Sequence, residues 1–478
     1  MSNKKDNSAM QRIAKLVDEN SFMEIGSLVT ARSTDFNLAQ TDTPSDGVIT
    51  GHGLIDGNLV FIYSQDASVL GGTIGEMHAK KVAAVYDMAV KMGAPVIGLI
   101  DCAGIRLQES VDALEAFGMI YSQQAKASGV VPQISAVFGT CGGGLAIVPA
   151  LSDFAFAEAD NTKLFINSPN AIDGNRIDKC NTASAAFQSA ETGMIDAVCS
   201  EDEIMARIRQ LVCILPSNNA QSCCSEDCMD DLNRACVSLD TMKGDPRYVL
   251  SEISDSHVFA EAKADYAKEM VAGFIKLNGM TVGAVANCTE IYDEKGTKTE
   301  EFDAALSARG CNKAADFIMF CDAFDIPVIS FTNAAGFRAS MCSEKNLAKA
   351  AGRLVNAFAS ATVPKINLIM DRAYGSAYTI MNSKSLGADI VYAWPDAKTG
   401  MMEAKLAAKI MYADKSADVI EKKAAEYEAL QGSVNAAAAR GYVDRIIDYP
   451  GTRKYLIAAV EMLCTKRVEQ PVRKHGTK

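Results

Sequence analysis

The chain has few of the residues and motifs on which side-chain catalysis usually depends. Its 478 residues include four histidines and one tryptophan. No GxSxG segment places a serine at a strand-to-helix elbow, and no HExxH segment offers a zinc-binding helix. We therefore exclude the hydrolases and peptidases that depend on these motifs. Among the histidines, His78 in the helical setting GEMHAKK is the candidate for contact with a ligand.

The chain also lacks a long apolar run and an excess of positive charge. No 18 uncharged apolar residues occur together, and the N-terminal MSNKKDNSAMQRIAK is not followed by the apolar core of a signal peptide. We therefore expect a cytoplasmic protein. The net charge of -12 comes from 47 Lys and Arg against 59 Asp and Glu. This balance argues against a general nucleic-acid binder, because binding to phosphates needs clustered cations.

The cysteines are numerous but form no pattern of a disulfide framework or a metal site. The 14 cysteines stand mostly singly in apolar segments, as is typical of reduced and buried thiols. The densest group, Cys223, Cys224 and Cys228, has no second pair and no spaced histidine to complete four zinc ligands. We predict an incidental loop there and no metal site.

The glycine-rich segment GTCGGGLA, residues 139–146, does not match a nucleotide-binding fingerprint. A dinucleotide-binding turn needs the spacing GxGxxG, and a P-loop needs a lysine after its last glycine. The segment has neither. Three consecutive glycines still give more bare backbone than an ordinary strand-to-helix turn requires. They indicate either close packing of a helix on a strand or the close approach of a ligand.

An internal repeat shows that this turn occurs twice. Residues 80–106 match residues 312–338, and residues 127–145 match residues 359–377. The offset stays at 232, the difference between Pro327 and Pro95, through both segments. One register that holds over two separate segments indicates a duplicated domain.

Each half alternates helical patterns with short apolar strands introduced by proline. These strands are PVIGLI and PQISAVF in the first half, and PVISFT and PKINLIM in the second. Uninterrupted apolar strands between helices are typical of a parallel sheet covered on both faces. The sequence therefore predicts an α/β fold in each half, joined by a polar connector at residues 216–246.

The two turns have a specific chemical meaning. Small residues at the start of a helix let backbone N–H groups approach a ligand oxygen, where they and the helix dipole stabilise negative charge. Such turns occur at matched positions, Gly143–Gly144 and Gly375–Ala377. We predict two oxyanion-binding sites built from backbone donors, one in each half.

In their order along the chain, the segments resemble the biotin-dependent carboxyltransferase family, which includes the β subunits of propionyl-CoA and related acyl-CoA carboxylases and the matching subunits of methylmalonyl-CoA decarboxylases. The resemblance covers almost the whole chain. It rests on SDGVITGHGLIDG, GGTIGEMHAKK, APVIGLIDCAGIRLQESVDAL and SGVVPQISAVFGTCGGG in the first half, and on FIKLNGMTVG, FCDAFDIPVISFTNAAGF, ATVPKINLIMDRAYGSAYTIMNSK, ADIVYAWP and AAAARGYVDRIID in the second.

This resemblance implies an α/β architecture of two tandem crotonase-like (ClpP/crotonase) domains related by internal duplication. The N-terminal domain, residues 1–225, would bind acyl-CoA, and the C-terminal domain, residues 246–478, would bind biotin. In the family the active site forms where the N-terminal domain of one subunit meets the C-terminal domain of another. We therefore expect a homo-oligomer, either a dimer or a hexamer.

The resemblance also assigns roles to the residues of the two turns. Gly143 and Gly144 would form the oxyanion hole for the CoA thioester, and Ser376 and Ala377 the hole for the ureido oxygen of biotin. Further candidate substrate-binding residues flank the turns or carry a charge suited to CoA phosphates: Ala103, Gly104, Arg106, Lys80, Lys81, Gly375, Tyr378 and Thr379.

The implied reaction moves a carboxyl group between biotin and a short-chain acyl-CoA without a side-chain base. Two holes and tight positioning would suffice, because a biotin nitrogen would take the α-proton of the thioester. The chain has no biotin-acceptor segment of the AMKM type. Biotin would arrive on a biotin carboxyl carrier protein, loaded by a biotin carboxylase or unloaded by a membrane decarboxylase subunit. The direction and the acyl group stay open.

The chain departs from the family pattern at four places. Ser376 replaces a glycine, residues 338–340 read Arg-Ala-Ser where Leu-Pro-Gly is expected, Lys349 and Ala350 replace an Arg-His pair, and Glu403 replaces a glycine. These departures would retune a pocket or alter the chemistry.

Two further interpretations therefore stay open. One is another crotonase-fold acyl-CoA enzyme of the hydratase or isomerase type, which would need two carboxylates over one turn. Glu109 and Glu115 are the nearest candidates. The other is a non-catalytic assembly subunit of a biotin-dependent complex.

Overall fold

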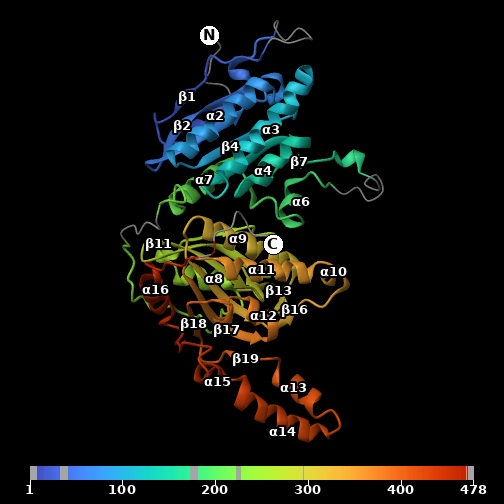
Figure 1. Cartoon of the computed structure of the whole chain (residues 1–478), viewed down its shortest axis with the longest axis vertical. Coiled ribbons are helices and arrows are strands. Elements are labelled where there is room, and N and C mark those ends of the chain that lie inside the picture. The colour runs from blue at the N-terminus through green and yellow to red at the C-terminus, as the bar shows by residue number, and fades with distance from the viewer. Residues whose placement is uncertain are drawn as a thin grey trace. The chain divides into compact units, whose positions relative to one another are not determined.

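The chain forms two compact units, which Figure 1 shows in different parts of the colour scale. Unit 1 is Met1–Ser222 and unit 2 is Cys223–Lys478. The computed structural model describes residues 8–32, 41–172, 181–221, 228–293, 295–469 and 471. Each unit has its own eight-stranded sheet and its own hydrophobic core.

The sheet of unit 1 is mainly parallel. Its strands follow the order β1-β2-β3-β4-β5-β6-β8, and β7 pairs with β5 off this path. The pairs β1–β2 and β2–β3 are antiparallel, whereas the pairs from β3 onward are parallel. The strands are β1 (Met23–Ile25), β2 (Val48–Ile55), β3 (Asn58–Gln65), β4 (Val96–Cys102), β5 (Gln133–Gly142), β6 (Phe154–Glu158), β7 (Lys163–Phe165) and β8 (Ala197–Cys199).

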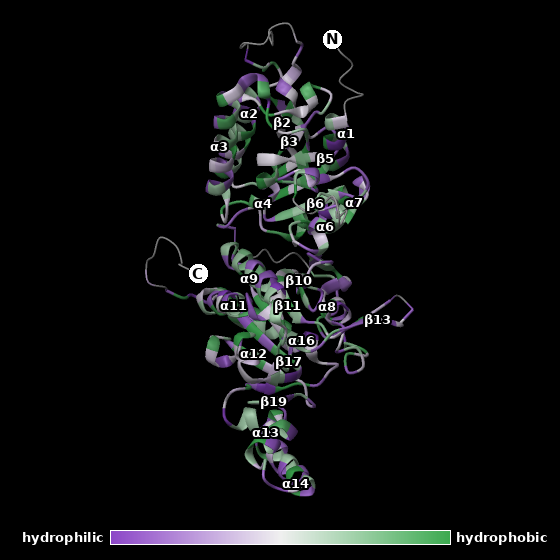
Figure 2. Cartoon of the chain, turned by 90° about the vertical axis from the view of Figure 1, so that its right-hand side faces the viewer, coloured by the Kyte–Doolittle hydropathy of each residue, from purple (hydrophilic) through white to green (hydrophobic). Residues whose placement is uncertain are grey.

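Helices cover both faces of this sheet because its central strands are apolar on both sides. In β4, Val96 and Ile100 belong to the core shared with α2 and α3, while Ile97 and Leu99 between them are buried on the opposite face. Figure 2 shows both colours on α2 and α3, as expected of amphipathic helices. The helices are α1 (Ser8–Leu16), α2 (Glu76–Met92), α3 (Ser110–Ala127), α4 (Ile147–Leu151), α6 (Ala185–Ala190) and α7 (Glu201–Ile214), with short 3-10 turns η3 (Pro44–Gly47), η4 (Leu70–Gly72), η5 (Leu107–Glu109), η6 (Gly143–Ala146) and η7 (Pro169–Ala171).

Unit 2 repeats this sheet. Its strands follow the order β9-β10-β11-β15-β17-β18-β20, and β19 pairs with β17 off this path. The strands of the main sheet are β9 (Phe259–Ala262), β10 (Met270–Leu277), β11 (Met280–Asn287), β15 (Val328–Ala334), β17 (Lys365–Tyr374), β18 (Ile390–Ala393), β19 (Lys398–Gly400) and β20 (Arg445–Ile446). Two small ladders join β12 (Glu290–Tyr292) to β13 (Lys298–Glu301) and β14 (Ala305–Leu306) to β16 (Gly336–Phe337).

The helices of unit 2 include a pair, α13 and α14, that projects from the rest of the unit (Figure 1). The helices are α8 (Pro246–Ile253), α9 (Ala308–Ala323), α10 (Met341–Glu344), α11 (Leu347–Ser360), α12 (Gly375–Ile380), α13 (Ala404–Met411), α14 (Ala417–Tyr427), α15 (Val434–Ala439) and α16 (Thr452–Leu463), with the short helical turns η8 (Asp255–His257), η9 (Lys384–Leu386) and η10 (Glu428–Gly432).

The strand bounds confirm the duplicated α/β fold that the sequence predicts. β4 and β15 coincide at the offset of 232, and so do β5 and β17. The hairpin β2–β3 matches β10–β11 at a smaller offset of 222, taken from Val48 and Met270. The extra residues of unit 2 fall between β11 and α9, where the β12–β13 ladder lies.

A buried lysine is part of the duplicated design. Lys81 on α2 donates from Nζ to the carbonyls of Ser45 and Val48, at 3.0 and 2.5 Å. Its counterpart, Lys313 on α9, donates to the carbonyls of Lys263 and Tyr266 at 2.7 and 2.8 Å. Burial lowers the pKa of Lys313 to about 8. Both ammonium groups therefore hold the loop before the sheet hairpin.

Candidate functional site

The glycine turn of unit 1 follows directly on a buried parallel strand. β5 ends at Gly142, and η6 begins at the next residue. Gly143 has φ +62, a left-handed conformation that favours glycine, and a β-carbon there would meet open space. Gly143 is half-buried and Gly144 is exposed. The backbone of these two residues is therefore accessible to a ligand.

Two other glycines of the segment serve packing instead. A β-carbon at Gly139 would lie 2.2 Å from Oδ1 of Asp101, and one at Gly142 would lie 2.9 Å from the ring of Phe165. No side chain fits in either place. Close packing therefore explains Gly139 and Gly142, whereas the approach of a ligand stays a prediction for Gly143 and Gly144.

The loop after β4 lies against this turn. Gly104, with φ +114, would carry a β-carbon 3.5 Å from the carbonyl oxygen of Gly142. The Ala103 N–H donates to Gly71 O and the Ile74 N–H to Gly104 O, both at 2.9 Å. Ala103 is exposed and Gly104 is buried. Three loops, after β3, β4 and β5, therefore meet around the candidate acyl-CoA site.

Arg106 supports this loop from inside the unit. Its side chain is 0% exposed, and Nη1 pairs with Asp46 Oδ1 at 2.6 Å and with Glu109 Oε1 at 2.8 Å. Nη2 donates to the carbonyl of Thr73 at 2.8 Å. The predicted contact of this guanidinium with CoA does not fit a fully buried ion pair. We correct that assignment: Arg106 holds the loop in place.

The two neighbouring lysines differ in exposure. Lys81 is buried and bonded to backbone carbonyls, which removes it from the set of CoA contacts. Lys80 is exposed at the surface of α2 and pairs with Glu76 at 2.8 Å. Of the two, only Lys80 remains placed to meet a ligand phosphate.

His78 is a structural residue in this fold. It is fully buried, its Nδ1 lies 3.0 Å from the carbonyl of Asp46, and its Nε2 lies 3.2 Å from Gln65 Nε2. Burial, helped by the charge of Arg106, lowers its pKa to about 3. The ring is therefore neutral near pH 7 and has no route to a ligand.

The thiols next to the site are equally inert. Cys102 ends β4 and pairs in register with Cys141 on β5. Burial raises the pKa of Cys102 to about 12 and raises that of Cys141 as well. Neither is a thiolate at neutral pH, so neither is a nucleophile.

Tyr121 is a residue of the site that no sequence motif marks. Its hydroxyl donates to the carbonyl of Gly144 at 2.5 Å, and a β-carbon at Gly144 would lie 2.9 Å from the same hydroxyl. Burial raises the pKa of Tyr121, which keeps it a hydrogen-bond donor. It comes from α3, more than 20 residues before the turn, so only the packing of α3 reveals the contact.

The turn of unit 2 has the same geometry. β17 ends at Tyr374, and α12 begins at Gly375 with φ +59, close to the value at Gly143. Ser376 is exposed and Ala377 is buried, as Gly144 and Leu145 are in unit 1. The replacement of glycine by Ser376 keeps the backbone N–H and adds a side chain that points away from the core.

Of the following residues of α12, Tyr378 is half-buried and Thr379 is exposed. Thr379 donates from Oγ1 to the carbonyl of Gly375 at 3.2 Å, within the helix. Tyr378 packs against the small core formed by Ala373, Ala393 and Val434. Burial raises the pKa of Tyr378 to about 12, so it carries no charge at neutral pH.

Glu403 lies in the wall of a cavity beside this turn. The segment before α13 approaches so closely that a β-carbon at Gly375 would lie 3.0 Å from the carbonyl of Met401. The cavity has a volume of about 730 Å³. It is lined by Ala335, Asp371, Arg372, Tyr374, Lys398, Met402, Glu403, Ala404, Lys405, Leu406, Glu421, Ala424, Ala425 and Glu428.

The other departures lie near the start of α11. Residues 338–340 are exposed, and Ser340 caps α10 by accepting from the N–H of Ser343 at 3.1 Å. Lys349 and Ala350 are on α11 and line a second cavity of about 970 Å³.

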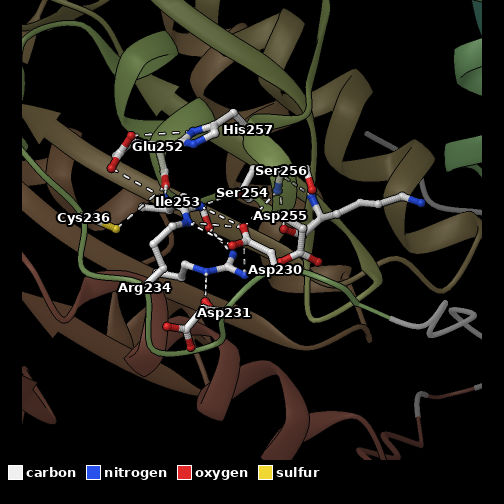
Figure 3. A network of polar contacts seen from close by, with 12 residues as sticks. Asp230, Asp231, Arg234, Cys236, Glu252, Ile253, Ser254, Asp255, Ser256 and His257 are labelled. Atoms are coloured by element: carbon white, nitrogen blue, oxygen red, sulfur yellow. Dashed lines mark hydrogen bonds and ion pairs between the residues drawn. The ribbon is translucent and has the colours of Figure 1, made fainter.

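The acid-rich start of unit 2 is an internal ion network. Figure 3 shows Asp230 among Arg234, Asp255 and their neighbours. Burial by itself would raise the pKa of Asp230, but hydrogen bonding to Arg234 and the charge of Arg453 outweigh it and lower the pKa to about 2. Arg453 is fully buried and pairs with Asp255 at 2.6 Å. This network ties α16 to the segment before β9.

The group of three cysteines that the sequence assigns to an incidental loop cannot be placed in full. Cys223 and Cys224 lie outside the described residues, and Cys228 donates to the carbonyl of Asp230 at 3.7 Å. Within the described ranges no group of His, Cys, Asp and Glu side chains could hold a metal ion. In the same ranges, no helix is long and apolar enough to cross a membrane.

Two matched α/β units, each with a left-handed glycine at the carboxyl end of a buried parallel strand, define a duplicated crotonase-like scaffold. Residues 3–477 match the family described as the carboxyl transferase domain. The chain therefore belongs to the carboxyl transferase domain family.

The similarity to its relatives covers nearly the full length of the chain. The chain is 36% identical over 482 residues to the propionyl-CoA carboxylase beta chain of Roseobacter denitrificans, covering 98% of this chain and 92% of that protein. It is 37% identical over 487 residues to the methylmalonyl-CoA decarboxylase subunit alpha of Propionigenium modestum, with the same coverage. The crystal structure of transcarboxylase 12S, a hexamer with methylmalonyl-CoA bound, superposes with a TM-score of 0.91 at 34% identity and covers 98% of this chain and 92% of its own.

Proposed function

We propose that this chain is the carboxyltransferase subunit that moves a carboxyl group between carrier-bound biotin and a short-chain acyl-CoA. The observation that carries the proposal is the pair of glycine turns, with φ +62 at Gly143 and +59 at Gly375, at the ends of equivalent strands. A reaction that develops negative charge on two oxygens needs two such sets of backbone donors.

In unit 1, the turn would bind the thioester oxygen. The N–H groups of Gly143 and Gly144 would stabilise the enolate oxygen, and the loop of Ala103 and Gly104 would line the same site. Fixed backbone donors are effective here because they need no reorganisation when the charge develops. Lys80 is the remaining candidate for contact with a CoA phosphate.

In unit 2, Ser376 and Ala377 would bind the ureido oxygen of biotin, flanked by Gly375, Tyr378 and Thr379. Biotin supplies the site with a ureido nitrogen that carries the carboxyl group. The residues fit such a group, because the turn is exposed at Ser376 while the packing of Ala377 fixes the backbone. These donors would orient the ureido ring and stabilise charge on its oxygen.

The side chains near the turn of unit 1 argue against a hydratase. Glu109 is buried and already bonded to Arg106 and to the N–H of Glu76, at 2.8 and 2.7 Å. Glu115 is an exposed residue of α3. A hydratase needs two carboxylates that share one water above the turn, whereas the carboxylate of Glu109 is already paired with Arg106.

The proposal includes partners. Biotin would arrive on a biotin carboxyl carrier protein, served by a biotin carboxylase or a membrane decarboxylase subunit, and the chain would act as a homo-oligomer, a dimer or a hexamer. The names of the relatives, a carboxylase and a decarboxylase, support both directions. Every cysteine within the described ranges is a free thiol, in keeping with a cytoplasmic enzyme.

The test uses the purified full chain with free biotin and three thioesters, malonyl-CoA, methylmalonyl-CoA and glutaconyl-CoA. Loss of the carboxyl group is followed by mass spectrometry. We expect biotin-dependent turnover of one thioester, with methylmalonyl-CoA as the first candidate. Gly144→Pro removes one N–H donor and should reduce kcat about a hundredfold.

Gly144→Ala is the matched control, because it keeps the N–H and adds the same β-carbon as proline, 2.9 Å from the Tyr121 hydroxyl. It should retain more activity than the proline variant, and the melting temperature of both must stay close to that of the wild type. No turnover of any thioester by a folded chain that binds CoA would favour the assembly subunit instead.

A further inference from the structure

The second cavity of unit 2 is lined by positive charge. It lies between the start of α9 and the first half of α11 and has a volume of about 970 Å³. Its wall carries Arg309, Lys349 and Arg353 together with the amides of Asn312 and Asn346. The lining residues that the structure describes include no carboxylate. In a chain of net charge -12, this is a local reversal of sign.

The three cations are not equally available. Arg353 pairs with Asp316 at 2.5 Å, which offsets part of its charge. The guanidinium of Arg309 lies 5.8 Å from the ring centre of Tyr266. Lys349 is exposed and forms no ion pair with any residue the structure describes. Lys349 is therefore the cation best placed to receive a ligand.

The duplication shows that these positions adjoin a glycine turn. At the offset of 232, Lys349 and Arg353 correspond to Phe117 and Tyr121 of α3. In unit 1 these two rings stack at 5.8 Å and are the nearest neighbours of a β-carbon built at Gly144. In unit 2, α11 likewise packs against α12, which begins with the equivalent turn.

The two units thus differ in chemistry at the same place. Where unit 1 presents an aromatic pair, unit 2 presents two cations, and Arg309 stands where unit 1 has Met77. Lysine and arginine in such a position are the usual partners of carboxylate and phosphate groups.

We propose that this cavity is an anion-binding site for a carboxylate or phosphate group of the ligand that unit 2 binds, with Lys349 as its main contact. The identity of that ligand rests on the proposed function. The anion would be the carboxyl group carried by biotin or a phosphate of CoA, which share the same recognition chemistry. Arg309 and Arg353 would add charge and hydrogen-bond donors.

The experiment measures binding of malonate and of pyrophosphate to the full chain by titration calorimetry, at constant ionic strength. Lys349→Gln should weaken binding of the preferred anion at least tenfold. Lys345→Gln, an exposed lysine outside the cavity lining, should change it less than twofold. Lys349→Arg should restore most of the affinity, and added salt should weaken wild-type binding.

The two anions distinguish the two sources. Tighter Lys349-dependent binding of malonate assigns the site to a carboxylate, and tighter binding of pyrophosphate assigns it to a phosphate. The proposal would be overturned if Lys349→Gln bound each anion as tightly as the wild type does. The titration needs no turnover, so it tests the anion site separately from carboxyl transfer. Anion binding without carboxyl transfer, and carboxyl transfer without anion binding, would therefore be distinguished.

Discussion

Asp153 and Asp389 stand directly before the equivalent strands β6 and β18, but their carboxylates have different charged neighbours. In unit 1, Asp153 Oδ2 accepts from the N–H of Gln133 at 2.8 Å. In unit 2, Asp389 Oδ2 accepts from the N–H of Lys365 at 2.8 Å and also pairs with Lys466 at 2.8 Å. Burial raises the pKa of Asp153 to about 7 despite its hydrogen bond, and the charge of Asp196 adds to the rise.

Asp153 should make unit 1 less stable as the pH rises. Between its ordinary pKa near 4 and its folded value of about 7, the unfolded chain loses the proton while the folded unit keeps it. Stability therefore falls by about 1.4 kcal/mol per pH unit from this group and then levels off above pH 7. Asp153→Asn removes the titration, so it should increase hydrogen-exchange protection of β5 relative to wild type at pH 7.5 and much less at pH 5.

Hydrogen exchange of peptides from β5 is measured for the variant and the wild type at the same pH. The intrinsic exchange rate, which changes with pH, then cancels from the comparison. Asp389→Asn is the matched control, because it removes the carboxylate that pairs with Lys466 and should reduce protection of β17 at pH 7.5. An Asp153→Asn effect that is the same at both pH values would contradict the prediction.

At the scale of elements, the accessible turn of unit 1 depends on a helix that is distant in sequence. The β5–η6 turn has one left-handed glycine and two glycines packed against Asp101 and Phe165. Tyr121 on α3 adds a hydrogen bond to the carbonyl of Gly144, and its ring stacks on Phe117. The helix therefore fixes the peptide that follows Gly144.

Tyr121→Phe removes this hydrogen bond and keeps the ring stack. We expect kcat of carboxyl transfer to fall about tenfold, with a change in KM for the thioester of less than twofold, because the donor geometry matters most when charge develops. Steady-state kinetics measure both constants. Tyr442→Phe, at an exposed tyrosine of unit 2, should leave both constants unchanged. An unchanged kcat in Tyr121→Phe would show that the turn is rigid without this contact.

At the scale of the whole molecule, each unit has what a folding domain needs. Each contains a complete eight-stranded sheet with helices on it, and each core is built from residues of its own unit. The single tryptophan, Trp394, is fully buried in unit 2 and donates from Nε1 to Thr452 Oγ1 at 3.0 Å. Its fluorescence therefore reports on unit 2.

A fragment of residues 223–478 should fold without unit 1. We expect blue-shifted tryptophan emission that is lost in one cooperative step in urea, as measured by fluorescence. A fragment of residues 1–222 should show a cooperative transition by circular dichroism. Neither fragment alone should transfer a carboxyl group, because each has one of the two turns. Emission like that of free tryptophan in the 223–478 fragment would contradict independent folding.

The sequence by itself determined the duplication, the α/β class and the positions of the two turns. These depend on local patterns: apolar strands after Pro95 and Pro327, helical periodicity between them, and small residues where the backbone must turn sharply. The offset of 232 between the two halves predicts which residues of unit 2 correspond to β4 and β5. The bounds of β15 and β17 agree with that prediction.

Only the tertiary structure decided what the charged and polar side chains do. Arg106, Lys81 and His78 look in sequence like ligand contacts, yet folding buries them against carboxylates and carbonyls contributed by other segments. The Tyr121–Gly144 contact and the cavity at Lys349 arise from helices packed beside the turns. Burial and partners are set by contacts between distant residues, and no local pattern records them.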